Sequence, residues 1–257
     1  MSEGNREIAK IIKKLDELYE HLEQLKVETI SSLGKKEALH IIDFHGNNWI
    51  DISGWIMAEY REEVRNSLLF FYYCMVFKEI CWMQLLFLMC NYSAVYRNLR
   101  YVWELIFQGY YVDSRCSDED LDRRIELARE LEEERYGWRL VNSVLKDLGF
   151  SDNEIEKHVR PLWVYLNKHA HPSPLQFEEV ARADFSILVT DAFNKELAVS
   201  LLRKTDAVFD LIHYAMLKSF SKAIGLAKKY RFLNEWKKYA PLTYSIVTDK
   251  DEIFCEP

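Results

Sequence analysis

The feature of this sequence that most limits its fold is an apolar run of 24 residues, SLLFFYYCMVFKEICWMQLLFLMC, at positions 67–90. A helix of that length can cross a bilayer. Lys78 and Glu79 lie near its middle, however, and a charge at that depth costs about 2.5 to 3.5 kcal/mol on insertion scales. We therefore interpret the run as a core helix surrounded by other helices, and we expect no membrane partner.

Chain breakers are scarce, since the 257 residues include only eight glycines and five prolines. Few turns favour long helices over a β-sandwich or a barrel. Hydrophobic residues make up 49% of the chain, so a large core can be buried. We predict an all-α, single-domain multi-helix bundle, with an N-terminal amphipathic helix at 1–34, the bundle at 35–240 and a tail at 241–257.

Residues 5–33 carry the clearest helical periodicity. Their apolar side chains recur in alternating steps of three and four: Ile8, Ile11, Leu15, Leu18, Leu22 and Leu25. This is heptad spacing, and Gly34 provides a stop signal. The pattern is equally typical of a helix lying on the bundle and of an arm that pairs with another chain.

Turn and cap residues divide the remainder. Gly46, Asn47 and Asn48 predict a turn, followed by a helix from near Trp55 to about residue 90 that breaks near residue 66. Further helices are expected at residues 92–113, 117–148, 151–171 (opened by the capping box SDNE), 191–229 and 231–239.

Charge and cysteine content exclude some classes of protein. The net charge of -7 argues against a globally basic nucleic-acid binder. The five cysteines include no C-x-x-C pair, so we expect no zinc site, no other metal and no cofactor. The N-terminus is charged and amphipathic and does not resemble a signal peptide, which predicts a cytoplasmic protein.

Two short polar patterns are candidates for a site. The first, RYVWE, places Arg100 and Glu104 four residues apart, on one face of a helix and among apolar neighbours. Such a pair orients a third group or holds a phosphate. The alternative is a plain helix salt bridge, worth about 0.3 to 0.5 kcal/mol if exposed.

The second pattern, LNKHAHP, lies at the end of a predicted helix and contains Asn167, His169 and His171. The helix dipole favours a charged histidine there, so we expect a raised pKa that suits a general acid or base. The alternative is a pair of helix-end residues that cap carbonyls. The two histidines do not share a helix face, which argues against a metal site formed by both.

An R-x-x-x-E element followed some seventy residues later by L-[S/N]-x-x-x-H-P resembles the pattern in helical proteins of the HEPN superfamily and related abortive-infection-type domains. The matching stretches, RYVWE and LNKHAH, lie within residues 91–174. The resemblance implies a helical bundle, commonly a homodimer, often with metal-independent RNA cleavage across the dimer interface. The family's R-x4-6-H signature is not matched, because Arg160 precedes His171 by eleven positions.

Cleavage of this kind needs a base for the 2'-hydroxyl and positive charge for the phosphorane-like transition state. With the resemblance as a guide, we assign His171 as the base and Arg100 as the electrostatic stabiliser. Asn167 fixes the imidazole or the phosphate, and Glu104 holds Arg100. The expected function is to bind or cleave RNA, with antiviral defence against mobile elements as its setting.

A basic segment near the C-terminus is a second candidate for RNA contact. Residues 218–239 hold seven cations against one acid, Glu235, with aromatic residues interleaved. Exposed aromatics beside cations bind single strands, whereas aromatics that point inward leave only a solvated basic face. The cations that we expect to bind nucleic acid are Lys228, Lys229, Arg231, Lys237 and Lys238.

Other patterns and functions compete with this interpretation. Glu37 and His40 form one E-x-x-H element, whereas a di-iron bundle needs two. The acidic run at 118–122 lies where a helix start favours acids in any case. One rival function is a non-catalytic interaction module, a dimeric scaffold in which the polar pairs lock the bundle. Another is a bundle that binds an apolar ligand in an aromatic-lined cavity.

Overall fold

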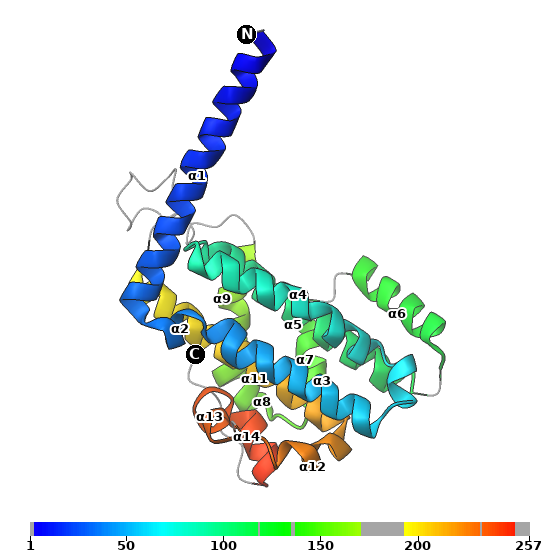
Figure 1. The fold of residues 1–257 in the computed structure, drawn as a ribbon. Helices are drawn as coiled ribbons and strands as arrows, with labels where there is room; N and C mark the ends of the chain where they lie inside the picture. The colour runs from blue at the N-terminus through cyan, green and yellow to red at the C-terminus, as the bar shows by residue number, and fades with distance from the viewer. Residues whose placement is uncertain (1–2, 118, 135–136, 171–192, 232, 250–257) are drawn as a thin grey trace.

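The computed structural model describes residues 3–117, 119–134, 137–170, 193–231 and 233–249. All regular structure in these ranges is helical, which confirms the predicted all-α class (Figure 1). In chain order the elements are α1 (Glu3–Leu33), α2 (Lys35–Ala38), the π-helix η1 (Ile41–Gly46), α3 (Asn47–Glu59), the 3-10 helix η2 (Glu63–Asn66), α4 (Leu68–Leu88), α5 (Tyr92–Arg115), α6 (Leu121–Glu134), α7 (Gly137–Asp147), α8 (Asp152–Glu154), the π-helix η3 (Ile155–Val159), α9 (Arg160–Ala170), α11 (Lys195–Ser219), the 3-10 helix η5 (Ser221–Ala223), α12 (Ile224–Ala227), α13 (Leu233–Tyr239) and α14 (Pro241–Thr248).

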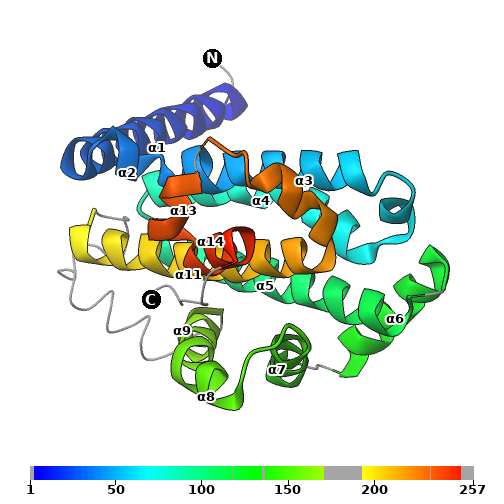
Figure 2. The same ribbon diagram turned by 90° about the horizontal axis from the view of Figure 1, so that it is seen from below.

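Helices α4, α5 and α11 form the centre of the bundle (Figures 1 and 2). A short connection at 89–91 joins α4 to α5, so the two helices run antiparallel and pack along their lengths. Gly109 permits the close approach, because a Cβ there would lie 2.8 Å from the Cα of Leu69. Along α11 every residue from 205 to 217 is buried, so this helix is the true core helix of the chain.

Helices α7 and α9 pack on α5, on the side seen below the bundle in Figure 2. The predicted capping box is confirmed, because the Ser151 side chain accepts from the Glu154 backbone and the Glu154 carboxylate accepts from the Ser151 backbone. It opens a run through α8 and η3 into α9. This run carries the second polar pattern of the sequence to the side of α5 that carries the first.

The sequence led us to expect that other helices surround α4. The structure shows that they do not. Four of its large apolar side chains are about half exposed and share one face, with heptad spacing. We call them the α4 stripe: Phe71, Met75, Trp82 and Leu85. Within the part of the chain that the structure describes, α4 alone is long and apolar enough to span a bilayer, and 44% of that window is buried.

The N-terminal helix α1 lies on the bundle along one half only, and whether the other half pairs with another chain stays a prediction. Leu25 and Thr29 are buried where its C-terminal half packs against the body. Its N-terminal half projects from the bundle (Figure 1), and Ile12, Leu15 and Leu18 there are more than half exposed. We call these three residues the arm stripe, and two of them, Leu15 and Leu18, belong to the heptad pattern. Gly34 adopts a positive φ of 87° and ends the helix as predicted.

Several predicted boundaries are wrong. The helix expected at 191–229 ends at Ser219, and the one expected at 117–148 corresponds to α6 and α7. Two further differences are explained by buried contacts. Instead of a turn at 46–48, η1 runs directly into α3, and Asn48 is buried, where its Oδ1 accepts from Tyr230 and Trp236. Residues 241–248, assigned to the tail, form α14. Buried Asp210 explains this helix, since its carboxylate accepts from the backbone N–H groups of Leu242 and Thr243.

Candidate functional site

Arg100 on α5 joins the two polar patterns that the sequence singled out. Its Nε and Nη2 donate to Oε1 of Glu104, at 3.2 and 2.9 Å. Its Nη1 donates to Oδ1 of Asn167 on α9. The structure thus brings three of the four predicted site residues into direct contact, although R-x-x-x-E and N-x-x-x-H lie far apart in sequence.

The side chain of Arg100 is largely buried, with 16% of its surface exposed. It lies over the ring of buried Trp163, with 5.2 Å between Cζ and the ring centroid. An arginine has five N–H donors, and the three hydrogen bonds to Glu104 and Asn167 leave two without a partner among the described residues. Asn167, which accepts from Arg100, is exposed. The two remaining N–H donors of Arg100 are the groups that an anion would contact.

Of the two histidines in LNKHAHP, only His169 lies within the described residues. His171 lies outside the described residues, so its position relative to Arg100 stays a prediction. His169 is buried between the rings of Tyr96 and Tyr165, with centroids 4.4 and 4.7 Å away. Burial, helped by the charge of Lys204, lowers the pKa of His169 to about 4. The raised pKa expected at this helix end is therefore wrong for His169.

The predicted basic face is exposed, but the described aromatic residues between its cations are buried or half-buried. All five cations of this face are exposed. Trp236 is fully buried, and Tyr230 is half-buried against Trp55. Tyr239 is half-buried with Nζ of Lys238 4.6 Å from its ring centroid, so none of these three rings is fully exposed for stacking. Lys228 pairs with Asp249 at 3.0 Å. An open depression beside this face is lined by Asp51, Trp55, Leu226, Lys229, Tyr230 and Arg231.

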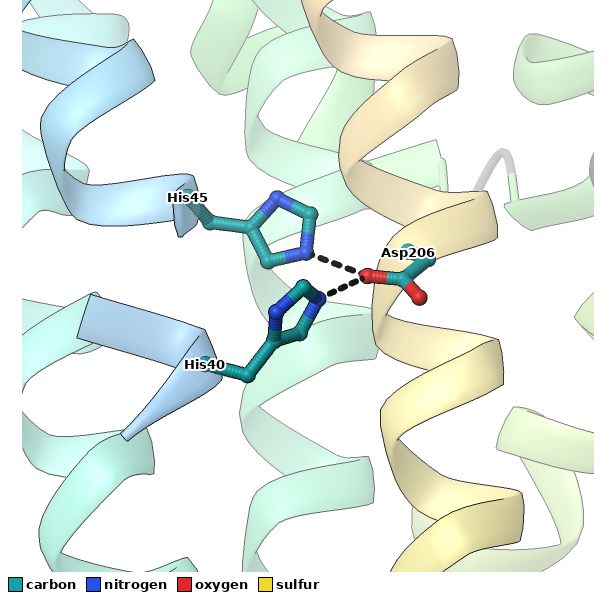
Figure 3. Close-up of side chains that lie close together, drawn as sticks. All are labelled: His40, His45 and Asp206. Carbon is teal, nitrogen blue, oxygen red and sulfur yellow. Dashed lines mark hydrogen bonds and ion pairs between the residues drawn. The ribbon is translucent and has the colours of Figure 1, made fainter. Parts of the chain in front are cut away.

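Sequence reasoning missed a buried cluster of two histidines and an aspartate (Figure 3). Nε2 of His40 lies 2.6 Å and Nε2 of His45 lies 2.8 Å from the same oxygen, Oδ1 of Asp206. His40 directly precedes η1 and His45 lies within it, whereas Asp206 belongs to α11. All three residues are buried.

The π-helix η1 explains how residues five apart reach one carboxylate. On a regular α-helix, five residues turn the chain so that His40 and His45 would point about 140° apart. The wider winding of a π-helix, with its i→i+5 hydrogen bonds, brings them closer to one face. Gln84 on α4 supports the irregular start of η1, because it accepts from the Ile42 N–H at 3.1 Å and donates to the Ala38 carbonyl at 2.8 Å.

Aromatic rings hold both imidazoles in place. His40 stacks on Phe44 and lies 4.6 Å from the ring centroid of Tyr239. His45 stacks on Phe209, one turn of α11 from Asp206, with 4.6 Å between centroids. This ring packing restrains the two imidazoles that contact Asp206.

Burial and hydrogen bonding set the charges of the cluster. Burial lowers the pKa of His45 to about 4, against the opposing effect of its bond to Asp206. Burial alone would raise the pKa of Asp206, but the hydrogen bonds from His40 and His45 outweigh it and hold that pKa below its usual value. At neutral pH the cluster contains an ionised carboxylate beside a neutral His45.

Further polar groups of α11 lie beside the cluster. His213 is buried, and its Nδ1 lies 3.1 Å from the Tyr73 hydroxyl. Its ring centroid is 6.3 Å from that of His45. Asp206, Asp210 and His213 recur at spacings of four and three, which places them on one face of a helix. That spacing was the sequence signal for a polar face on a core helix.

In comparisons with known proteins, no family model, no curated protein and no solved structure matches the chain. The all-α fold is thus established from the chain's own structure. Its function has to be argued from the two polar clusters described above and from the exposed surfaces around them.

Proposed function

We propose that this chain is a HEPN-like helical protein that binds RNA and cleaves it without a metal ion. The observation that carries the proposal is the bridge from Arg100 to both Glu104 and Asn167. The two motifs of the family resemblance occur on separate helices, and a chance match would not require their polar side chains to meet. That they do meet supports a common site.

The chemistry follows from the groups present. Glu104 orients the guanidinium, and the two remaining N–H donors of Arg100 face a phosphodiester oxygen and stabilise the charge that develops on it. Asn167 lies between Arg100 and the end of α9, one helical turn before His171 in sequence. His171 is the base that takes the proton of the 2'-hydroxyl while the 2'-oxygen forms its bond to phosphorus. The bond from phosphorus to the 5'-oxygen breaks, and the leaving 5'-oxygen takes a proton from water. No step in this scheme needs a metal ion.

Binding of the strand is assigned to the exposed cations of the basic face. Because Trp236 is buried, this contact is electrostatic and does not involve base stacking. The depression beside Lys229 and Arg231 gives the strand a place to enter. The proposal therefore predicts binding with little sequence preference and strong salt dependence.

Cleavage of labelled single-stranded RNA tests the proposal. Wild-type protein is assayed in buffer without added metal, with and without EDTA, and folding is followed by circular dichroism in both. We expect cleavage in both buffers and a loss of about 100-fold or more in His171→Ala and Arg100→Ala. Arg97→Ala, an exposed arginine one turn from Arg100, is the matched control. Absent cleavage by folded wild type, or equal cleavage by all variants, removes the nuclease.

The exposed apolar stripes favour a second candidate function, assembly as a dimeric scaffold. The α4 stripe presents large side chains with heptad spacing on a rigid helix. Lys78, which is 70% exposed, lies between Met75 and Trp82 on this face. Exposed apolar side chains of this kind mark interaction sites on soluble proteins. We propose a second copy of this chain as the partner, which also matches the homodimer expected from the family resemblance. Under this function the Arg100 bridge only locks α5 to α9.

A further inference from the structure

We propose that His40, His45 and Asp206 bind one divalent transition-metal ion, with Zn²⁺ as the preferred ion. This site is independent of the RNA chemistry, which is assigned to residues of α5 and α9 and to His171. Two imidazoles and one carboxylate form a recurrent ligand set for zinc and for non-haem iron. Cysteine spacing gave no hint of it, because none of the three ligands is a cysteine.

The positions of the ligand atoms suit an ion. The three candidate ligand atoms lie within 4.8 Å of one another, and both Nε2 atoms already point at one carboxylate oxygen (Figure 3). Tetrahedral zinc with bonds of about 2.0 to 2.1 Å sets its ligand atoms about 3.3 Å apart. The two Nε2–Oδ1 distances of 2.6 and 2.8 Å need to grow by only roughly 0.5 to 0.7 Å to reach that spacing.

The scaffold is built to aim these groups. The π-helical winding of η1, the two bonds from Gln84 and the stacking on Phe44 and Phe209 all fix where the imidazoles point. A π-helical turn is a rare winding that occurs often at functional sites. A histidine pair that served only to fill the core would not need it.

The charges also favour a cation. Asp206 brings a negative charge into a buried place, and a neutral imidazole only partly compensates for it. The exposed ammonium of Lys238 on α13 acts on Asp206 only from a distance, and it also acts on Glu37 of α2. A divalent ion would neutralise this excess at its source.

Binding would tie the segment α2–η1–α3 to the core helix α11. Three protein ligands leave a fourth position for water, and the burial of the site favours a tightly held ion. Because the ligands come from positions far apart in sequence, the site exists only in the folded chain. Metal binding would then contribute directly to folding stability.

The test starts from full-length protein purified without chelator or added metal, in which bound metals are measured by mass spectrometry. We expect about one transition-metal ion per chain. After chelation, Zn²⁺ is titrated by calorimetry, and thermal unfolding is followed with and without it. Wild type should bind one Zn²⁺ and unfold at a higher temperature when loaded. Co²⁺ should give the visible absorption of a tetrahedral site.

Two ligand variants and one control decide the assignment. Asp206→Asn and His45→Gln should bind Zn²⁺ more than about 100-fold more weakly, beyond the 10- to 100-fold usual for an outer-shell residue. His158→Gln, outside the cluster, should bind like wild type. If a variant fails to fold, the wild-type titration still decides. No binding by wild type, equal binding by Asp206→Asn, or binding of Mg²⁺ or Ca²⁺ alone overturns the proposal.

Discussion

The Nη1 group of Arg100 donates a hydrogen bond to Oδ1 of Asn167, which lies 67 residues further along the chain. This contact connects α5 to α9 through polar atoms at the edge of a largely apolar interface. Its neighbour Trp163 is buried beneath the guanidinium. The bridge is thus at once a structural tie and the centre of the proposed RNA site, and the two roles can be separated by measurement.

The structural role predicts a coupling energy. Arg100→Gln should lower the free energy of unfolding by about 1 to 2 kcal/mol, because Glu104 is 37% exposed and water replaces part of what it loses. Asn167→Ala should cost less. A double-mutant cycle in urea should give a coupling of at least about 0.5 kcal/mol. Additive single effects would mean that the two side chains do not interact in solution.

Gly109 predicts a packing limit between α4 and α5. A Cβ at this position would lie 2.8 Å from Leu69 Cα and 3.0 Å from its N, and neither backbone atom can move aside easily. Gly109→Ala should therefore destabilise the fold by about 1 to 3 kcal/mol. Gly54→Ala is the matched control, because Gly54 lies in α3 with nothing within 4 Å, and it should stabilise by about 0.5 to 1 kcal/mol. Urea unfolding of both variants compares them.

The lowered pKa of His169 leads us to predict that the fold is less stable at acidic pH. The folded pKa of about 4 lies below the ordinary 6.5, so the unfolded state takes up a proton first. The contribution of neutral His169 to the free energy of unfolding is fully present above pH 6.5 and is lost as the pH falls toward 4. We expect a loss of roughly 2 kcal/mol from this group after allowance for solvent screening.

Chemical unfolding at a series of pH values measures this dependence. His169→Phe keeps a ring between Tyr96 and Tyr165 and should flatten the curve between pH 6.5 and 4. Lys204→Met removes the charge that helps lower the pKa of His169, so it should narrow the window. An unchanged curve for His169→Phe would show that other groups carry the acid response.

The α4 stripe predicts the surface of the dimer. Trp82→Glu combined with Leu85→Glu places charges in the middle of an apolar interface and should convert a dimer to a monomer, as judged by light scattering after size exclusion. Leu15→Glu with Leu18→Glu, in the arm stripe, is the comparison and should leave the dimer intact. Dissociation by the arm variant alone would move the interface to α1. A monomeric wild type would rule out both.

The basic face predicts the salt dependence of RNA binding. Each cation that contacts a phosphate contributes about 0.7 to the slope of log affinity against log salt for a single strand. Replacing Lys229, Arg231, Lys237 and Lys238 by glutamine should weaken binding and flatten that slope. Lys228→Gln should have a smaller effect, because Asp249 already pairs with this residue. Fluorescence anisotropy at several salt concentrations measures each slope, with Lys78→Gln on α4 as control.

Much of the fold was predictable because its signals are local. Heptad spacing, Gly34 and the Ser151 capping box act within one or two helical turns, and the helices that they predict are present. The turn predicted at 46–48 failed because Asn48 is used in a buried contact with Trp236, a tertiary partner that no local pattern reveals. The same holds for α14, whose start depends on Asp210 in α11.

The candidate sites also differ in whether a local sequence pattern could reveal them. Arg100 and Asn167 were noticed because each belongs to a pair with the regular α-helical spacing of four. His40 and His45 were not paired, because a spacing of five points in different directions on an α-helix and only a π-helix corrects it. Asp206 looked like an ordinary residue of a long amphipathic helix. Its role depends on which face α11 turns toward η1.

The wide turn of η1 has a consequence for how this segment tolerates changes in length. A π-turn contains one residue more than the α-turn that it replaces. If one of the four residues between His40 and His45 were deleted, the two histidines would be four apart and still share a face of a regular helix. An insertion would set them six apart, about 120° away from each other on an α-helix. Shortening by one residue is therefore tolerable here, whereas lengthening separates the pair.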